Sequence, residues 1–117
     1  MTEVTAPLAP LVAEVLEDRK AENIVTLEVA HLTTIAEQMV IASGTSNRHV
    51  KSLVDYVIEA VKSSGQQVFA VEGRETHEWV LLDLGHVLVH VMQAESREFY
   101  DLERLWTELP TNSESEV

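Results

Sequence analysis

The segment at residues 44–50, GTSNRHV, contains residue types that could bind an anion. It joins an expected strand to an expected helix, and helix N-termini commonly bind phosphate groups. It lacks, however, the spaced glycines of a dinucleotide-binding loop and the Gly-Lys-Ser/Thr of a P-loop. The simpler interpretation is that Gly44 permits the turn while Thr45 or Ser46 caps the helix. Three residues of the first helical turn are then open to a partner-binding role: Asn47, Arg48 and His49.

Carboxylates and histidines elsewhere in the chain do not complete a catalytic or metal site. Nucleotidyltransferases hold metal ions on two or three closely spaced carboxylates, whereas the expected hairpin offers only Glu78 and Asp83, on opposite strand faces. His86 and His90 share a strand face, but four residues of strand separate their Cα atoms by ~13 Å, too far to share an ion. The sequence has no cysteine, hence no thiolate ligand or nucleophile. We expect a protein that is not an enzyme, with no catalytic residues, no metal and no cofactor.

Trp79 opens a segment whose two faces differ. Side chains alternate along residues 79–84, so the aliphatic residues at even positions share one face, while the indole shares the other with Leu81 and Asp83. The aliphatic face suits the protein core. The indole face is either covered by a helix or exposed as an anchor for a partner, since aromatic residues dominate many protein interfaces. From the pattern alone, both alternatives stay open.

The elements that must position these residues alternate between helical and strand patterns. Helical periodicity with suitable caps predicts helices, apolar runs predict strands, and Gly85 suits a type II′ turn between the last two strands. The expected order is α-β-β-α-β-β-β-α. The second helix starts at the cap on Thr45 or Ser46 and stops at Gly65, and the other elements lie at residues 7–20, 24–29, 39–42, 68–71, 79–84, 87–92 and 95–106. The strand–helix–strand step across residues 41–68 implies a parallel, right-handed crossover, whereas the hairpin adds antiparallel pairing. We therefore predict a single α/β domain with a mixed five-stranded sheet packed with helices.

Composition narrows the class of protein. The 117 residues suffice for one domain, which we expect at 7–107, between a flexible N-terminus at 1–6 and a disordered acidic tail at 108–117. With 20 acidic and 8 basic residues, the net charge of −12 disfavours nucleic acid and anionic lipid as partners and favours a basic protein. An acidic surface also serves simply to keep a small protein soluble. No apolar run approaches the ~20 residues of a membrane span, and the first residues resemble no targeting signal, so we expect a cytoplasmic protein.

Five segments together closely resemble the ribosomal silencing factor family, also called iojap-like proteins. They lie at residues 41–50, 71–73, 78–85, 89–92 and 97–106, and the resemblance covers roughly residues 8–106 in order and spacing. It implies an α/β fold distantly like that of nucleotidyltransferases but without their catalytic carboxylates. It also implies a protein that binds the fourteenth protein of the large ribosomal subunit. Bound there, such proteins block joining of the two subunits and repress translation under nutrient limitation or in stationary phase.

The resemblance also implies where the partner binds. The family's tryptophan in that contact falls on Trp79, so we expect a binding surface made of Trp79, Val80, Leu81 and Asp83, extended by Asn47, Arg48 and His49. His86 departs from the family, which usually has aspartate after the hairpin glycine. If that aspartate touches the partner, the contact is weaker or pH-dependent here; otherwise His86 is a tolerated turn residue. Two alternatives remain: a nucleotide- or phosphate-binding enzyme built around Gly44 to His49, and a homodimer of the free protein through the Trp79 face.

Overall fold

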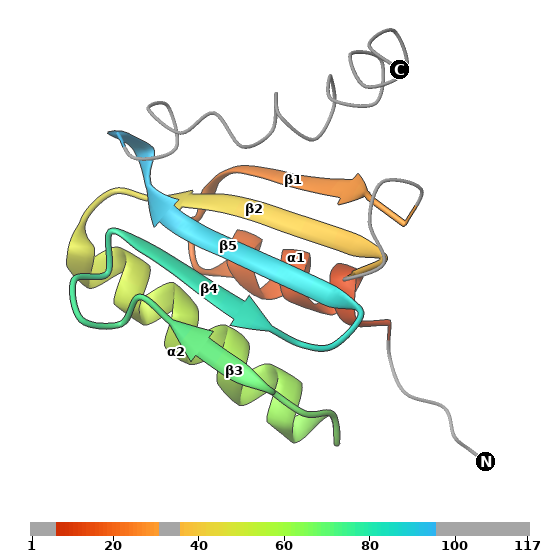
Figure 1. Ribbon diagram of the computed structural model, residues 1–117. Coiled ribbons are helices and arrows are strands. Elements are labelled where there is room, and N and C mark those ends of the chain that lie inside the picture. Colours follow the sequence, from red (N-terminus) through yellow and green to blue (C-terminus); the bar gives the residue numbers. More distant parts are fainter. Residues whose placement is uncertain (1–6, 31–35, 96–117) are drawn as a thin grey trace, which may run out of the picture.

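Two helices and a five-stranded sheet form the part of the chain, residues 7–30 and 36–95, that the computed structural model describes. The helices α1 (Leu8–Asp18) and α2 (Asn47–Ser63) pack together on one face of the sheet (Figure 1). Within the described residues, neither helix has the length and apolar character needed to cross a lipid bilayer. The expected last helix lies outside these ranges except for its first residue, as do the expected flexible N-terminus and acidic tail.

Helix α1 forms where the sequence carries an apolar stripe at helical spacing. Pro10 is tolerated because it lies in the first turn, where its missing N–H has no helical acceptor. The helix ends with Lys20 in the left-handed region, at φ 70°. Its last turn is closed by two backbone hydrogen bonds, from Lys20 N–H to Glu17 O and from Ala21 N–H to Leu16 O. The buried face of the helix consists of Leu8, Ala9, Val12 and Leu16.

Helix α2 has the clearest start and stop signals in the chain. The Ser46 hydroxyl accepts a hydrogen bond from His49 N–H at 3.1 Å, which identifies Ser46 as the N-cap. At the other end Gly65 adopts φ 86°, so the same closing motif as in α1 is made here by a glycine. The sequence predicts a stripe that also includes Ile58, which is partly buried, and the fully buried residues are Val50, Leu53, Val54, Val57 and Val61.

The sheet is mixed, as predicted, with the strand order β1-β2-β5-β4-β3. Strands β2 and β5 pair in parallel, and the other three pairs are antiparallel. The edge strand β1 contains a register shift between Glu22 and Val25, and the other edge strand, β3, has only three residues. The strands are β1 (Glu22–Glu28), β2 (Gln38–Gly44), β3 (Ala70–Glu72), β4 (Trp79–Asp83) and β5 (Val87–Gln93).

The crossover expected across residues 41–68 joins strands that are not neighbours. Strand β3 is antiparallel to β4, and β4 is antiparallel to β5, which is parallel to β2. Strand β3 therefore runs in the same direction as β2, but β5 and β4 lie between them. The hairpin of β4 and β5 fills the gap between them. Its turn is fixed to the start of β2, because the His86 carbonyl accepts hydrogen bonds from Glu37 N–H and Gln38 N–H at 2.8 and 3.1 Å. Parallel pairing therefore joins β2 to β5 and not to β3.

Each face of the sheet carries its own buried cluster. On the helix face, side chains of both helices pack against alternate residues of β2, β4 and β5. We call the opposite side the outer face. There a second cluster gathers Val29, Ala36, Met39, Ile41 and Met92, with Leu27, Trp79 and Leu88 partly buried against it. Strand β2 is thus buried on both faces, which explains its continuous apolar sequence.

Candidate partner-binding site

Trp79 lies at the start of β4 with its side chain on the outer face. Register pairs Trp79 with Met92 of β5, and the indole packs against the second cluster, where it stays partly exposed. Neither α1 nor α2 covers it, because both helices pack against the opposite face of the sheet. One side of the indole therefore supports the cluster and part of it stays exposed, while its use as an anchor for a partner stays a prediction.

His90 contacts Trp79 from the neighbouring strand β5. The indole Nε1–H donates a hydrogen bond to His90 Nδ1 at 2.9 Å, and the two ring centroids lie 5.8 Å apart. The imidazole is only 7% exposed. Burial lowers the pKa of His90 from 6.5 to about 4, because the charged form loses its hydration. The ring is therefore neutral near pH 7, with a lone pair on Nδ1 available to the indole.

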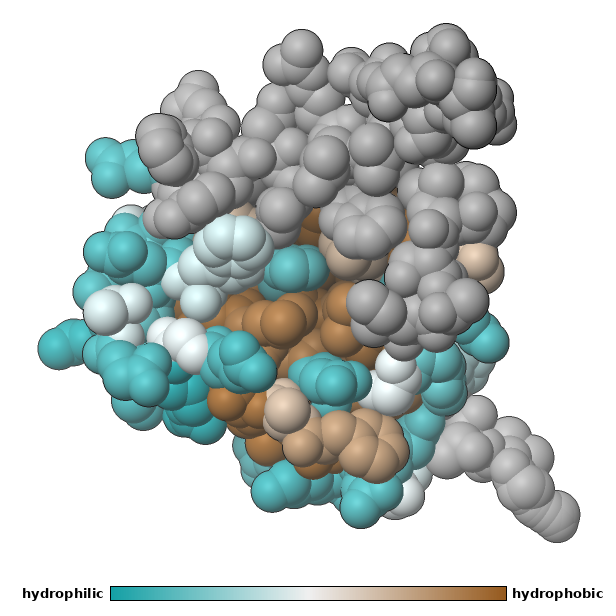
Figure 2. All heavy atoms as spheres, viewed as in Figure 1, coloured by the Kyte–Doolittle hydropathy of each residue, from teal (hydrophilic) through white to brown (hydrophobic). Residues whose placement is uncertain are grey.

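Leu81 extends the partly exposed surface along β4. It pairs in register with His90 and, like Trp79, points to the outer face. Figure 2 shows apolar side chains gathered at the centre of this face, with polar residues along the left and lower sides of the view. Val80, expected beside them, is 0% exposed and belongs to the cluster under the helices. Its side chain cannot touch a partner of the folded protein, because alternation along the strand turns it to the other face.

Asp83 has a role within the hairpin. One carboxylate oxygen accepts a hydrogen bond from Gly85 N–H at 2.9 Å, which stabilises the turn between β4 and β5. Gly85 has φ 96° and His86 has no positive φ, as a type II′ turn requires. Asp83 remains partly exposed on the outer face, at the far end of β4 from Trp79.

The first turn of α2 lies near the Trp79 end of the sheet. The Asn47 side chain donates to Thr76 O at 3.0 Å and accepts from the Gln93 side chain. Gln93 N–H in turn donates to Glu78 O, next to Trp79. Asn47 therefore joins three segments at this end: the start of α2, the loop before β4 and the end of β5.

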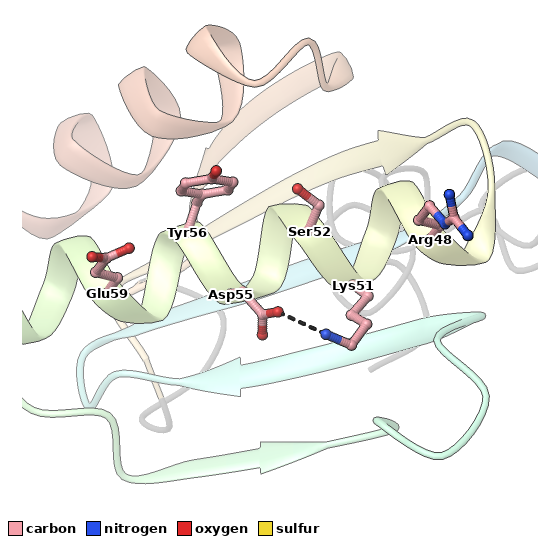
Figure 3. Close-up of a pocket in the computed structure, with 6 residues that line it drawn as sticks. All are labelled: Arg48, Lys51, Ser52, Asp55, Tyr56 and Glu59. Carbon is pink, nitrogen blue, oxygen red and sulfur yellow. Dashed lines mark hydrogen bonds and ion pairs between the residues drawn. The ribbon is translucent and has the colours of Figure 1, made fainter.

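His49 and Arg48 differ in how much of the side chain is available. The ring of His49 accepts from Thr45 N–H at Nδ1, 2.9 Å away, and donates from Nε2 to Arg19 O at 3.0 Å. It therefore ties the turn before α2 to the end of α1. Arg48 is exposed and lines a shallow groove on α2 with Lys51, Ser52, Asp55, Tyr56 and Glu59 (Figure 3).

The groove on α2 carries mixed charge. Asp55 bonds to both Lys51 and Arg74, at 3.0 and 2.6 Å. Partial burial alone would raise the pKa of Asp55, but the hydrogen bond and charge of Lys51, together with Arg74, lower it overall. The charged residues that line the groove are two cations, Arg48 and Lys51, and two anions, Asp55 and Glu59, so the groove offers no concentrated charge of one sign.

The turn at residues 44–50 does not have the geometry of a phosphate site. Two of the backbone N–H groups that an anion would need are already donated, from Thr45 to the His49 ring and from His49 to the Ser46 hydroxyl. A Cβ on Gly44 would lie 2.8 Å from a methyl group of Val50. We expected Gly44 to be needed for the turn. Glycine is needed here instead for close packing of β2 against α2. Among the described residues, no three potential ligands are grouped to hold a metal ion.

Two residues of the site were not identified from the sequence as parts of it. His90 was considered only as a metal ligand. Gly73, at φ 94°, passes so close to Trp79 that a Cβ would lie 2.1 Å from the Trp79 carbonyl oxygen.

Comparison with known proteins gives a consistent result. A family model described as "Ribosomal silencing factor during starvation" matches residues 2–117. The chain is 42% identical over 99 residues to "Ribosomal silencing factor RsfS" of Chromobacterium violaceum, covering 85% of this chain and 81% of that relative. It is 31% identical over 100 residues to "Mitochondrial assembly of ribosomal large subunit protein 1" of Mus musculus, covering 83% of this chain and 44% of that longer relative.

Two solved structures share the fold. The crystal structure of protein CV0518 from Chromobacterium violaceum superposes with a TM-score of 0.85 at 40% identity, covering 90% of this chain and 88% of that one. A crystal structure from Bacillus halodurans superposes with a TM-score of 0.77 at 32% identity, covering 85% and 92% of the two chains.

Proposed function

The chain belongs to the ribosomal silencing factor family, and from this premise we propose that it binds the large ribosomal subunit and blocks joining of the small one. The contact on the large subunit is its fourteenth ribosomal protein. By preventing joining, the protein represses translation when nutrients are limited or growth has stopped. The observation that carries the proposal is the partly exposed pair Trp79 and Leu81 on the sheet face that the two helices leave free.

The outer face has the properties of a docking surface. An aromatic side chain backed by a rigid, buried cluster contributes strongly to binding, because little conformational freedom is lost on contact. Trp79 and Leu81 are two residues apart on one strand, so both side chains point the same way. Asp83 can contribute at the rim of this face, whereas Arg48 lies in the groove on α2 and Val80 is left out because it is buried. The protein acts by occupying space and needs no catalytic group.

The net charge of the chain supports a basic protein as the partner. We place both proteins in the cytoplasm. The chain carries a net charge of −12, so a positively charged ribosomal protein is attracted over roughly one screening length, ~8 Å at physiological ionic strength. The mouse relative's name refers to assembly of a large ribosomal subunit, which fits a partner on that subunit.

Sedimentation of ribosomal subunits tests this proposal. Adding the protein to purified subunits should decrease the joined ribosome and leave the protein on the large subunit. Trp79→Ala should weaken binding by about 2 kcal/mol or more, roughly thirtyfold, if the indole is a hot spot. Tyr56→Ala is the matched control, because Tyr56 is an exposed aromatic residue, 37% exposed, on the helix side of the molecule.

Two results would overturn the proposal. If the protein leaves subunit joining unchanged, the silencing role is wrong. If folded Trp79→Ala binds the large subunit as tightly as the unmodified protein, the site assignment is wrong. Light scattering over a range of concentrations tests the competing occupant of this face, a second copy of the chain, since a dimer that Trp79→Ala dissociates would place the contact there.

A further inference from the structure

His90 is a polar residue at the centre of the outer face. It lies on β5 between Ile41 of β2 and Leu81 of β4, which are its partners in register. Among the described residues, only Ser43 and His90 are both polar and buried. A leucine or valine at this position would continue the apolar cluster without loss of hydration. Packing alone therefore does not explain why a histidine occupies this position.

The hydrogen bond from Trp79 fixes which nitrogen of His90 carries the proton. Because Nδ1 accepts from the indole, a neutral ring must have its proton on Nε2. Nε2 is buried and has no hydrogen-bond partner among the described residues. A buried donor without an acceptor destabilises the folded protein. His90 thus lowers the stability of the free protein while it supplies an acceptor to Trp79.

We propose that His90 is a positioning residue that holds the indole of Trp79 in the orientation in which the partner binds it. This inference rests on the proposed function, because it assigns His90 a role in the same docking surface. A tryptophan side chain that is already oriented loses less freedom on binding, which raises affinity without adding a contact.

The backbone of Trp79 is held from the other side. Gly73 lies so close to Trp79 that a Cβ on Gly73 would be 2.1 Å from the Trp79 carbonyl oxygen. The carbonyl therefore has no room to move toward Gly73. Gly73 O also accepts from His77 N–H at 3.1 Å, which closes the loop before β4. The loop therefore fixes the main chain of Trp79, and His90 fixes the side chain.

Two variants of the full chain separate the acceptor from the shape of the residue. His90→Leu keeps an apolar side chain of similar size but has no acceptor. His90→Asn carries a carbonyl oxygen near the position of Nδ1 and keeps one. In ¹⁵N-labelled protein without ribosomes, the indole N–H signal of Trp79, assigned with Trp79→Phe, should be protected from hydrogen exchange. We expect His90→Leu to lose this protection and His90→Asn to keep most of it.

Binding to purified large subunits gives the second measurement. His90→Leu should weaken binding roughly three- to tenfold, the range expected for loss of one hydrogen bond, and His90→Asn should restore most of the affinity. In a Trp79→Phe background, which lacks the donor, His90→Leu should cause no further loss. The thermal midpoint of His90→Leu should equal or exceed that of the unmodified protein.

Each contrary result has a defined meaning. If the ¹⁵N shifts place the proton of His90 on Nδ1, or if His90→Leu keeps indole protection, the positioning role is overturned. It is also overturned if His90→Leu unfolds at a markedly lower temperature, because His90 would then be needed for the fold. The exchange measurement uses no ribosome, so it decides the positioning role even if Trp79→Ala shows that the partner docks elsewhere.

Discussion

Lowering the pH from 7 to 5 should destabilise the protein by about 2 kcal/mol more than it destabilises the His90→Leu variant. Burial lowers the pKa of His90 from 6.5 to about 4 in the folded protein. Between these values the unfolded chain binds a proton on His90 and the folded chain does not. The free energy of unfolding therefore falls as the pH falls through this range, and the contribution of neutral His90 is fully present only above pH 6.5.

The magnitude follows from the two pKa values of His90. A group with a pKa of 6.5 in the unfolded chain and about 4 in the folded chain lowers the free energy of unfolding as the pH falls. Relative to high pH, the decrease is about 0.2 kcal/mol at pH 7 and about 2 kcal/mol at pH 5. Below pH 4 the difference levels off near 3 kcal/mol, about 1.4 kcal/mol for each pH unit between the two values. Carboxylates that titrate in the same range act on both proteins, so the comparison with His90→Leu isolates the imidazole.

Urea unfolding followed by circular dichroism at pH 7 and pH 5 measures the effect. The unmodified protein and His90→Leu should have similar stability at pH 7, or the variant should be more stable, and the gap should widen at pH 5. His86→Gln is the control, since it removes an exposed histidine from the adjoining turn and leaves His90 in place. Equal loss of stability in the unmodified protein and in His90→Leu would refute the reasoning, because His90 would then be protonated to the same extent folded and unfolded.

Three further predictions concern the backbone and the charge of the molecule. Lys20→Gly should stabilise the protein by roughly 0.5–1 kcal/mol and Gly65→Ala should destabilise it by about 1 kcal/mol, because both residues end a helix with positive φ, which glycine adopts most easily. Urea unfolding measures both changes, and a loss of stability in Lys20→Gly would contradict the argument. Gly73→Ala should displace the start of β4 and weaken large-subunit binding at least as much as Trp79→Ala, as measured by co-sedimentation; normal binding would show that the loop can adjust. In stopped-flow experiments the association rate with the large subunit should fall as salt is raised from 50 to 500 mM, because screening shortens the range of the attraction between the acidic protein and its partner. A constant rate would exclude charge steering.

Local features of the fold, including the hairpin of β4 and β5, were predictable from the sequence, whereas the pairing of strands far apart in the sequence was not. The N-cap at Ser46, the stop at Gly65 and the turn at Gly85 depend on residues close together in the chain, and the structure confirms all three. The pairing of β2 with β5 depends on contacts between residues about 50 positions apart in the sequence, such as Gln38 with Val87. Such pairing is decided by how all the elements pack, and no local pattern encodes it.

The geometry of the proposed binding surface was predictable to the level of strand faces. Alternation placed Trp79 and Leu81 together and assigned the aliphatic face to the core, but it could not tell whether a helix also covers the indole face. The structure shows that the two helices cover the aliphatic face, which buries Val80. His90 could have been found, because a two-residue turn at Gly85 fixes the hairpin register and sets His90 diagonally across from Trp79. The depressed pKa and the close contact of Gly73 depend on three-dimensional burial and were beyond the sequence.

The two edge strands have a consequence for how the molecule behaves in concentrated solution. A long, regular edge strand would offer its free backbone groups to another chain and start aggregation. Here one edge, β3, has only three residues, and the other, β1, is interrupted by the register shift near Asn23, which has φ 51°. Neither edge is therefore a good template for sheet extension. This protection allows the outer face to keep its apolar surface, the proposed docking site, since chains that meet through it have no matching edge along which to polymerise.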